Sequence, residues 1–107
     1  MKHITYYQQG DILLFPVQEI PANATEIKGH NNVLAEGEST GHAHRMAAPV
    51  QLFRNAQQPT DVFMAVPKRI ELRHEEHATQ VIPPGKYRIG RVQEYDYSTQ
   101  EARRVQD

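Results

Sequence analysis

The 107-residue sequence contains no cysteine and no tryptophan. Without cysteine, the chain cannot form disulfides, thiolate metal sites or iron–sulfur clusters, and it has no cysteine nucleophile. Any metal ion that it binds must therefore be held by nitrogen and oxygen atoms.

Long apolar segments are also absent. No run approaches the roughly 18 apolar residues that a membrane-spanning helix needs, and the beginning of the chain, Met1-Lys2-His3, leads into no apolar stretch of signal-peptide length. There is no excess of one charge, because 12 basic and 13 acidic residues give a formal net charge of -1. We therefore expect a cytoplasmic protein with no membrane association and no strong attraction to nucleic acid.

Length and patterning predict a single β domain that comprises residues 1–107. Hydrophobic residues make up 38% of the chain, and the mean hydropathy is -0.70, so the core should be modest. Short apolar stretches recur every 8 to 12 residues or so with proline or glycine between most of them, and no long helical pattern is present. This pattern is typical of an all-β fold, either a small antiparallel barrel or a sandwich.

The apolar stretches define the expected strands. The continuously apolar run 62–66 should lie at the centre of the core. Residues 21–24 are expected to form a loop, Gly90 predicts a bulge, and residues 98–107 fit either a short helix or an edge strand. The expected strands are 3–7, 12–15, 32–36, 50–54, 62–66, 69–75, 78–82 and 86–95.

Two of the six histidines lie one residue apart, just after a glycine-rich turn, in Gly41-His42-Ala43-His44-Arg45. If this stretch is extended, the two-residue period places His42 and His44 on one face and Arg45 on the other. Two imidazoles would then point into the same small volume. This is how a strand can offer two ligands to a metal ion.

A second histidine cluster, His-Glu-Glu-His, lies at residues 74–77. The preceding residues alternate, and if Ile70 and Leu72 face the core, His74 does so too. His77 follows three residues later and would point to the opposite face of a regular strand. It can join the same pocket only if the chain leaves strand geometry soon after His74.

The predicted site is a polar pocket of histidines with an accessory carboxylate. Glu76 ranks first among the nearby carboxylates because it shares the inward phase of His74, and it could bind a metal, orient an imidazole or act as a general base. Imidazole suits most divalent first-row metals, so Zn, Fe, Ni and Mn all fit. The candidate metal ligands are His42, His44, His74, His77 and Glu76.

Two other interpretations fit the same residues. In a metal-free enzyme, two histidines would act as acid and base while Arg45 stabilises an anion, which suits phosphodiester cleavage. In a non-catalytic interaction module, the histidines would complete a polar core, and an exposed edge strand would allow a homodimer. The pocket would accept a small-molecule ligand. Because the sequence names no reaction, whether the chain is an enzyme stays open.

Part of the pattern resembles the cupins, small β-barrels in which histidines and a carboxylate bind a metal. The resemblance rests on Gly-His-x-His at residues 41–44, followed later by Pro83-Pro84-Gly85 before an alternating strand. In cupins a glutamate follows the histidine pair, whereas this chain has Ala-Pro at residues 48–49. The resemblance therefore implies metal ligands only at His42 and His44.

The whole chain also resembles a group of small, uncharacterised β-rich proteins from bacteria and phages. The shared elements are Gly-Asp at residues 10–11, Thr-Gly-His-x-His-Arg at 40–45, His-x-Glu-His at 74–77 and Glu-Tyr at 94–95. This resemblance covers most of the length and implies no known activity.

Overall fold

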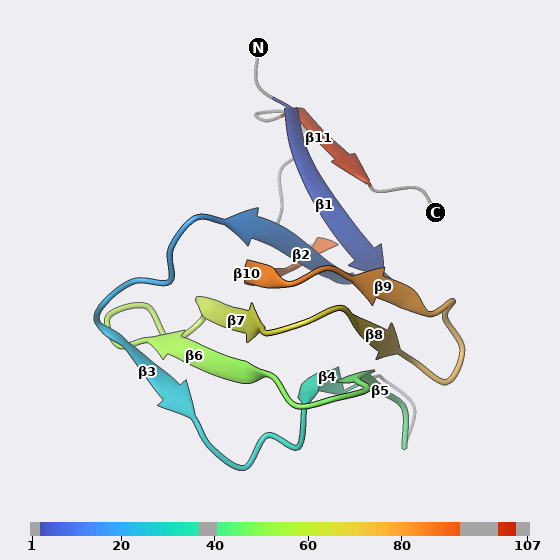
Figure 1. Cartoon of the computed structure of the whole chain (residues 1–107), viewed down its shortest axis with the longest axis horizontal. Coiled ribbons are helices and arrows are strands. Elements are labelled where there is room, and N and C mark those ends of the chain that lie inside the picture. The colour runs from blue at the N-terminus through green and yellow to red at the C-terminus, as the bar shows by residue number, and fades with distance from the viewer. Residues whose placement is uncertain (1–2, 37–40, 93–100, 105–107) are drawn as a thin grey trace.

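The computed structural model describes residues 3–36, 41–92 and 101–104, which form eleven strands (Figure 1). Those residues include no helix that is long and apolar enough to cross a membrane. The strands are β1 (His3–Gln9), β2 (Ile12–Val17), β3 (Ala24–Ile27), β4 (Val33–Glu36), β5 (Ala43–Met46), β6 (Gln51–Asn55), β7 (Val62–Val66), β8 (Ile70–Arg73), β9 (Gln80–Ile82), β10 (Gly85–Arg91) and β11 (Glu101–Arg104).

The strands form two sheets. One sheet has seven strands in the order β11-β1-β2-β10-β7-β6-β3, and the other has four in the order β4-β5-β8-β9. Neighbouring strands pair antiparallel, apart from the parallel pair β1–β11. The predicted all-β fold is confirmed, and the packing of the described strands is that of a sandwich rather than a closed barrel.

Prolines mark three places where the chain passes from one sheet to the other. Pro49 lies between β5 and β6, Pro67 between β7 and β8, and Pro83 between β9 and β10. Proline has no N–H group and cannot donate to a strand ladder. Each proline therefore favours ending one ladder and letting the chain enter the other sheet.

Both sheets contribute to one main core. The apolar run 62–66 forms β7, which is paired on both sides and buries Phe63, Met64 and Val66, as expected of a strand near the centre of the core. The buried residues of this core are Ile12, Leu14, Ala35, Met46, Val50, Leu52, Met64, Val66, Ile70, Leu72, Ile82 and Tyr87.

One local expectation was wrong, and one strand was not expected. Residues 21–23 form the expected loop, but Ala24 already begins β3, a short edge strand that pairs with β6 and has no fully buried residue, so its sequence carries no strong apolar signal. Gly90 forms no bulge, because β10 pairs with β2 in unbroken register from Lys86 to Arg91. A Cβ atom at Gly90 would lie 3.2 Å from Cε2 of Phe15, so glycine makes room for that ring.

The alternatives for the C-terminal segment are resolved only in part. Glu101–Arg104 forms the edge strand β11, which lies beside β1 in Figure 1, and the helical alternative is wrong for these four residues. The rest of the segment, residues 98–100 and 105–107, lies outside the described residues.

Candidate metal centre

Four histidines converge at one end of the four-stranded sheet. His42 directly precedes β5, His44 is the second residue of β5, and His74 directly follows β8. The ring centroid of His74 lies 5.7 Å from that of His42 and 4.4 Å from that of His44. It lies 4.6 Å from the ring centroid of His77. His74 is therefore the central member of the cluster.

Two features bring His74 and His77 close to His42 and His44: the alternation of side chains along β8, and a bend after it. Ile70 and Leu72 are buried as the alternation predicts, and His74 continues their inward phase next to His44. The chain then bends over residues 75–77. As a result the ring of His77 stacks on that of His44, with 6.0 Å between centroids and 11° between planes.

The tightest group of potential metal ligands is His42, His74 and Glu75. One ligand atom from each residue lies within 4.8 Å of the other two. Oε1 of Glu75 accepts a 2.8 Å hydrogen bond from the Ala43 N–H, and this bond is the main cause that lowers the pKa of the Glu75 carboxyl. The hydrogen bond from β5 thus holds the Glu75 carboxylate next to two imidazoles. This donor set suits zinc and other first-row metals.

The position of Glu76 differs from the expectation that ranked it first. Its side chain is 67% exposed, and its Oε1 lies 3.6 Å from Nδ1 of His42. The bend at residues 75–77 ends the strand alternation on which the ranking rested. Glu76 therefore lies beside the tight group, and Glu75 supplies its carboxylate.

Gln9 determines which nitrogen of His44 carries the proton. Its side chain is only 1% exposed, and its Nε2 donates to the carbonyls of Leu72 at 2.8 Å and Ala78 at 3.0 Å. The remaining atom, Oε1, can only accept, and it lies 2.9 Å from Nδ1 of His44. His44 must therefore donate from Nδ1, which leaves the lone pair on Nε2.

The surroundings of His44 also keep it neutral. Burial, and after it the neighbouring His74, lowers the pKa of His44 to about 4, with smaller contributions in the same direction from His77 and Arg91. Asp11 opposes this shift, since its Oδ1 lies 3.7 Å from Nε2 of His44. At neutral pH this imidazole is therefore in the form that can coordinate a metal ion.

His74 is held by a different contact. Its Nδ1 accepts a 3.0 Å hydrogen bond from the Glu76 N–H, so the neutral ring carries its proton on Nε2. A metal ion could bind Nδ1 in place of this donor, or bind Nε2 after the proton has moved to Nδ1. Either route breaks the bond to Glu76, so metal binding at His74 requires the bend at residues 75–77 to adjust.

The turn between β1 and β2 also contacts the histidine cluster. The sequence predicted a turn here but gave no sign of these contacts. Gly10 has a positive φ of 57°, and a Cβ atom there would lie 2.7 Å from Nε2 of His77. Glycine supplies both the backbone conformation and the space. Gln9 and Asp11 flank it, and the partners of Gln9 lie 63 and 69 residues away along the chain, a contact that no local pattern reveals.

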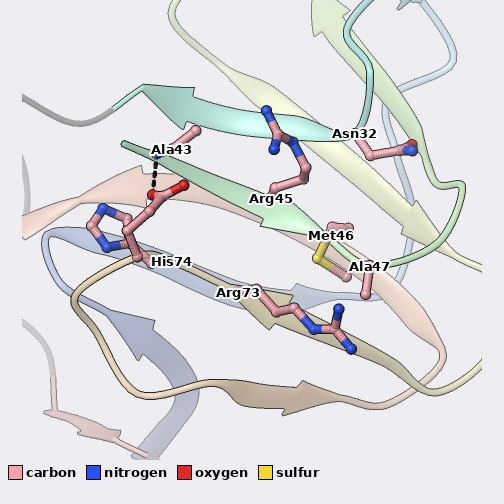
Figure 2. A pocket seen from close by; sticks show the side chains of 8 residues that line it. Asn32, Ala43, Arg45, Met46, Ala47, Arg73 and His74 are labelled. Carbon is pink, nitrogen blue, oxygen red and sulfur yellow. Dashed lines mark hydrogen bonds between the residues drawn. The ribbon is translucent and has the colours of Figure 1, made fainter. Parts of the chain in front are cut away.

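A groove of about 520 Å³ adjoins the tight group (Figure 2). It includes His74 and Glu75, so two of the three potential ligands can be reached from it. Arg45 is exposed while His44 is buried, as the two-residue period predicted. The lining residues are Asn32, Ala43, Arg45, Met46, Ala47, Arg73, His74 and Glu75.

Residues 8–92 match a protein family described as a domain of unknown function, DUF8820. The chain belongs to this family. The DUF8820 match includes Gln9 and all four clustered histidines, and it agrees with the expectation of an uncharacterised β-rich family. No curated protein and no solved structure matches the chain. The likeness to cupins stays a prediction, and Glu94 and Tyr95, which carried part of the second resemblance, lie outside the described residues.

Proposed function

We propose that this DUF8820 domain binds a divalent metal ion through its histidine cluster. His42, His74 and Glu75 would supply ligands, and His44 and His77 stand close enough to His74 to join or replace them after small movements. The observation that carries the proposal is the meeting of three donor atoms within 4.8 Å from two segments that are about thirty residues apart in the chain. Zn, Fe, Ni and Mn all remain suitable.

The bond between His44 and Gln9 supports the proposal. Histidines that bind metals usually donate their other ring N–H to a fixed acceptor, which sets the tautomer and the direction of the ring. Nδ1 of His44 donates in this way to Oε1 of Gln9, its Nε2 lies 3.7 Å from Oδ1 of Asp11, and its ring lies next to that of His74. The lone pair of Nε2 is therefore available to a metal ion once the ring is neutral.

Calorimetric titration with Zn²⁺ tests the proposal on protein that is purified without a nickel column and then treated with chelator. We expect one site per chain in the wild type. His42→Ala and His74→Ala should each weaken zinc binding by about tenfold or more, because each removes a ligand. His30→Asn is the control, because His30 lies outside the cluster and asparagine can still accept the hydrogen bond from the Asn32 N–H.

Two results would contradict the proposal. One is a wild-type chain that takes up no zinc, iron, nickel or manganese. The other is wild-type affinity in both variants while circular dichroism shows an unchanged β fold. Activity that survives chelation would instead favour the metal-free acid–base enzyme that the sequence also allows.

A further inference from the structure

Two arginines lie directly opposite each other on neighbouring strands beside the proposed metal site. Arg45 of β5 pairs with Arg73 of β8 in the strand register. Like charges in this arrangement destabilise a sheet. The Arg73 guanidinium binds Oε1 of Glu71 at 2.9 and 2.6 Å, whereas the Arg45 side chain has no hydrogen bond or ion pair with any other described residue. Arg45 is therefore the less neutralised member of the pair, and an anion bound beside it would reduce the repulsion between the two guanidinium groups.

The groove has the shape to receive such an anion. Ala43 and Ala47 share a face with Arg45, and their small side chains leave the space beside it hollow. Figure 2 shows Arg45 and Arg73 pointing apart on the two sides of this space, with His74 at its far end. Arg45, Arg73 and two of the potential metal ligands thus line the same groove, so a ligand in it could approach both arginines and the proposed metal site.

A metal ion at the proposed site would change the net charge of the groove. Without a metal, the positive charges of Arg45 and Arg73 are balanced by the carboxylates of Glu71 and Glu75. A divalent ion at the proposed site would add two positive charges beside the groove, where Glu76 is a further nearby carboxylate. The groove would then attract an anion much more strongly than the chain as a whole, whose formal charge is -1.

We propose that this groove binds the phosphoryl group of a small phosphate ester, with oxygens contacting Arg45, Arg73 and the metal ion. The inference rests on the proposed metal site for the third of these partners. A phosphoryl group presents three terminal oxygens in a tetrahedron, whereas a carboxylate has only two oxygens in one plane, and guanidinium groups pair well with phosphate oxygens. The volume of about 520 Å³ also leaves room for an organic group.

Titration of the zinc-loaded and metal-free protein with phenyl phosphate tests this inference. We expect the zinc-loaded wild type to bind more tightly than the metal-free form. Arg45→Gln and Arg73→Gln should each weaken binding to the zinc-loaded protein by about tenfold or more, the effect of losing a charge-assisted hydrogen bond. Arg54→Gln is the matched control, because Arg54 is an exposed arginine of β6 that does not line the groove, and it should stay within about twofold of wild type.

Benzoate, which carries a carboxylate on the same ring, and the zinc content of each sample decide among the remaining outcomes. The inference is overturned if both groove variants bind phenyl phosphate as the wild type does, or if benzoate binds equally well. Zinc-loaded protein that binds no phenyl phosphate overturns the groove alone. Protein that takes up no zinc but binds phenyl phosphate through the two arginines overturns the metal site and supports the groove.

Discussion

His44 links the stability of the metal-free fold to pH. A histidine in an unfolded chain has a pKa of about 6.5, whereas burial and then His74 lower the pKa of His44 to about 4 in the fold. As the pH falls, the unfolded state takes up the proton first. Neutral His44 therefore makes its full contribution to the free energy of unfolding above about pH 6.5, and this contribution is lost as the pH falls toward 4. The loss should be at most about 3–4 kcal/mol, since the pKa falls from 6.5 to about 4 and one pKa unit corresponds to about 1.4 kcal/mol.

Urea unfolding of the metal-free protein at several pH values measures this loss. His44→Gln removes the titrating group, so the free energy of unfolding of the variant should fall less than that of the wild type over the same pH range. Parallel pH profiles for the two proteins would show that another group causes the acid sensitivity.

Gly10 is needed for two reasons: its backbone has a positive φ, and its missing side chain leaves space for the ring of His77. Gly10→Ala should lower the free energy of unfolding by about 1–2 kcal/mol, because alanine is strained at a positive φ. It should also weaken zinc binding, because its Cβ would lie 2.7 Å from Nε2 of His77 and push that ring away.

Gly29→Ala separates these two effects. Gly29 also has a positive φ, 72°, but a Cβ atom there would meet nothing within 4 Å. This variant should lose similar stability and keep wild-type zinc affinity. Equal zinc affinity in both glycine variants would show that the position of His77 does not matter for the site.

The sequence was sufficient to find the histidines but not the residues that hold them. A two-residue period is visible in any extended stretch, so His42, His44 and His74 could be placed on inward faces. The role of Gln9 depends on carbonyls of distant strands, and the choice of Glu75 over Glu76 depends on a bend. Neither feature leaves a periodic signal.

At the scale of elements, the end of β8 and the bend after it decide how the second cluster contributes. His74 contacts all three other histidines, whereas His77 is exposed and reaches the site only through the bend. We therefore expect His74→Ala to weaken zinc binding at least as much as His77→Ala, as measured by calorimetry. If the His77 variant loses zinc and the His74 variant keeps it, the ligands come from the bend rather than from the strand phase.

The strands themselves were mostly predictable, because seven of the eight expected apolar stretches contribute to the main core, which holds the sheets together. Strand β3 was not predicted, since it is an edge strand whose residues are only half-buried or exposed. The interpretation of Gly90 failed for another reason. A glycine that makes room for a ring on the neighbouring strand looks, in sequence, like one that breaks a ladder.

For the whole molecule, composition and spacing predicted an all-β fold. The division into two sheets arises at connections such as those containing Pro49, Pro67 and Pro83, where a strand of one sheet ends and the next strand joins the other. The sequence could not show which ends meet, because Gln9 of β1 and the β8–β9 connection belong to different sheets and lie about seventy residues apart in the chain. That meeting brings Gln9 and Gly10 against the histidine cluster, so the proposed site depends on the complete fold rather than on a local motif. A single domain, a cytoplasmic location and a homodimer stay predictions.

The presence of a metal ion at this cluster is tested most directly by anomalous scattering from crystals grown with Zn²⁺, measured on both sides of the zinc absorption edge. We expect a peak about 2.0–2.2 Å from a ring nitrogen of His42, a ring nitrogen of His74 and a carboxylate oxygen of Glu75. Crystals in which zinc occupies other positions while these three side chains keep their metal-free arrangement would contradict the proposed function.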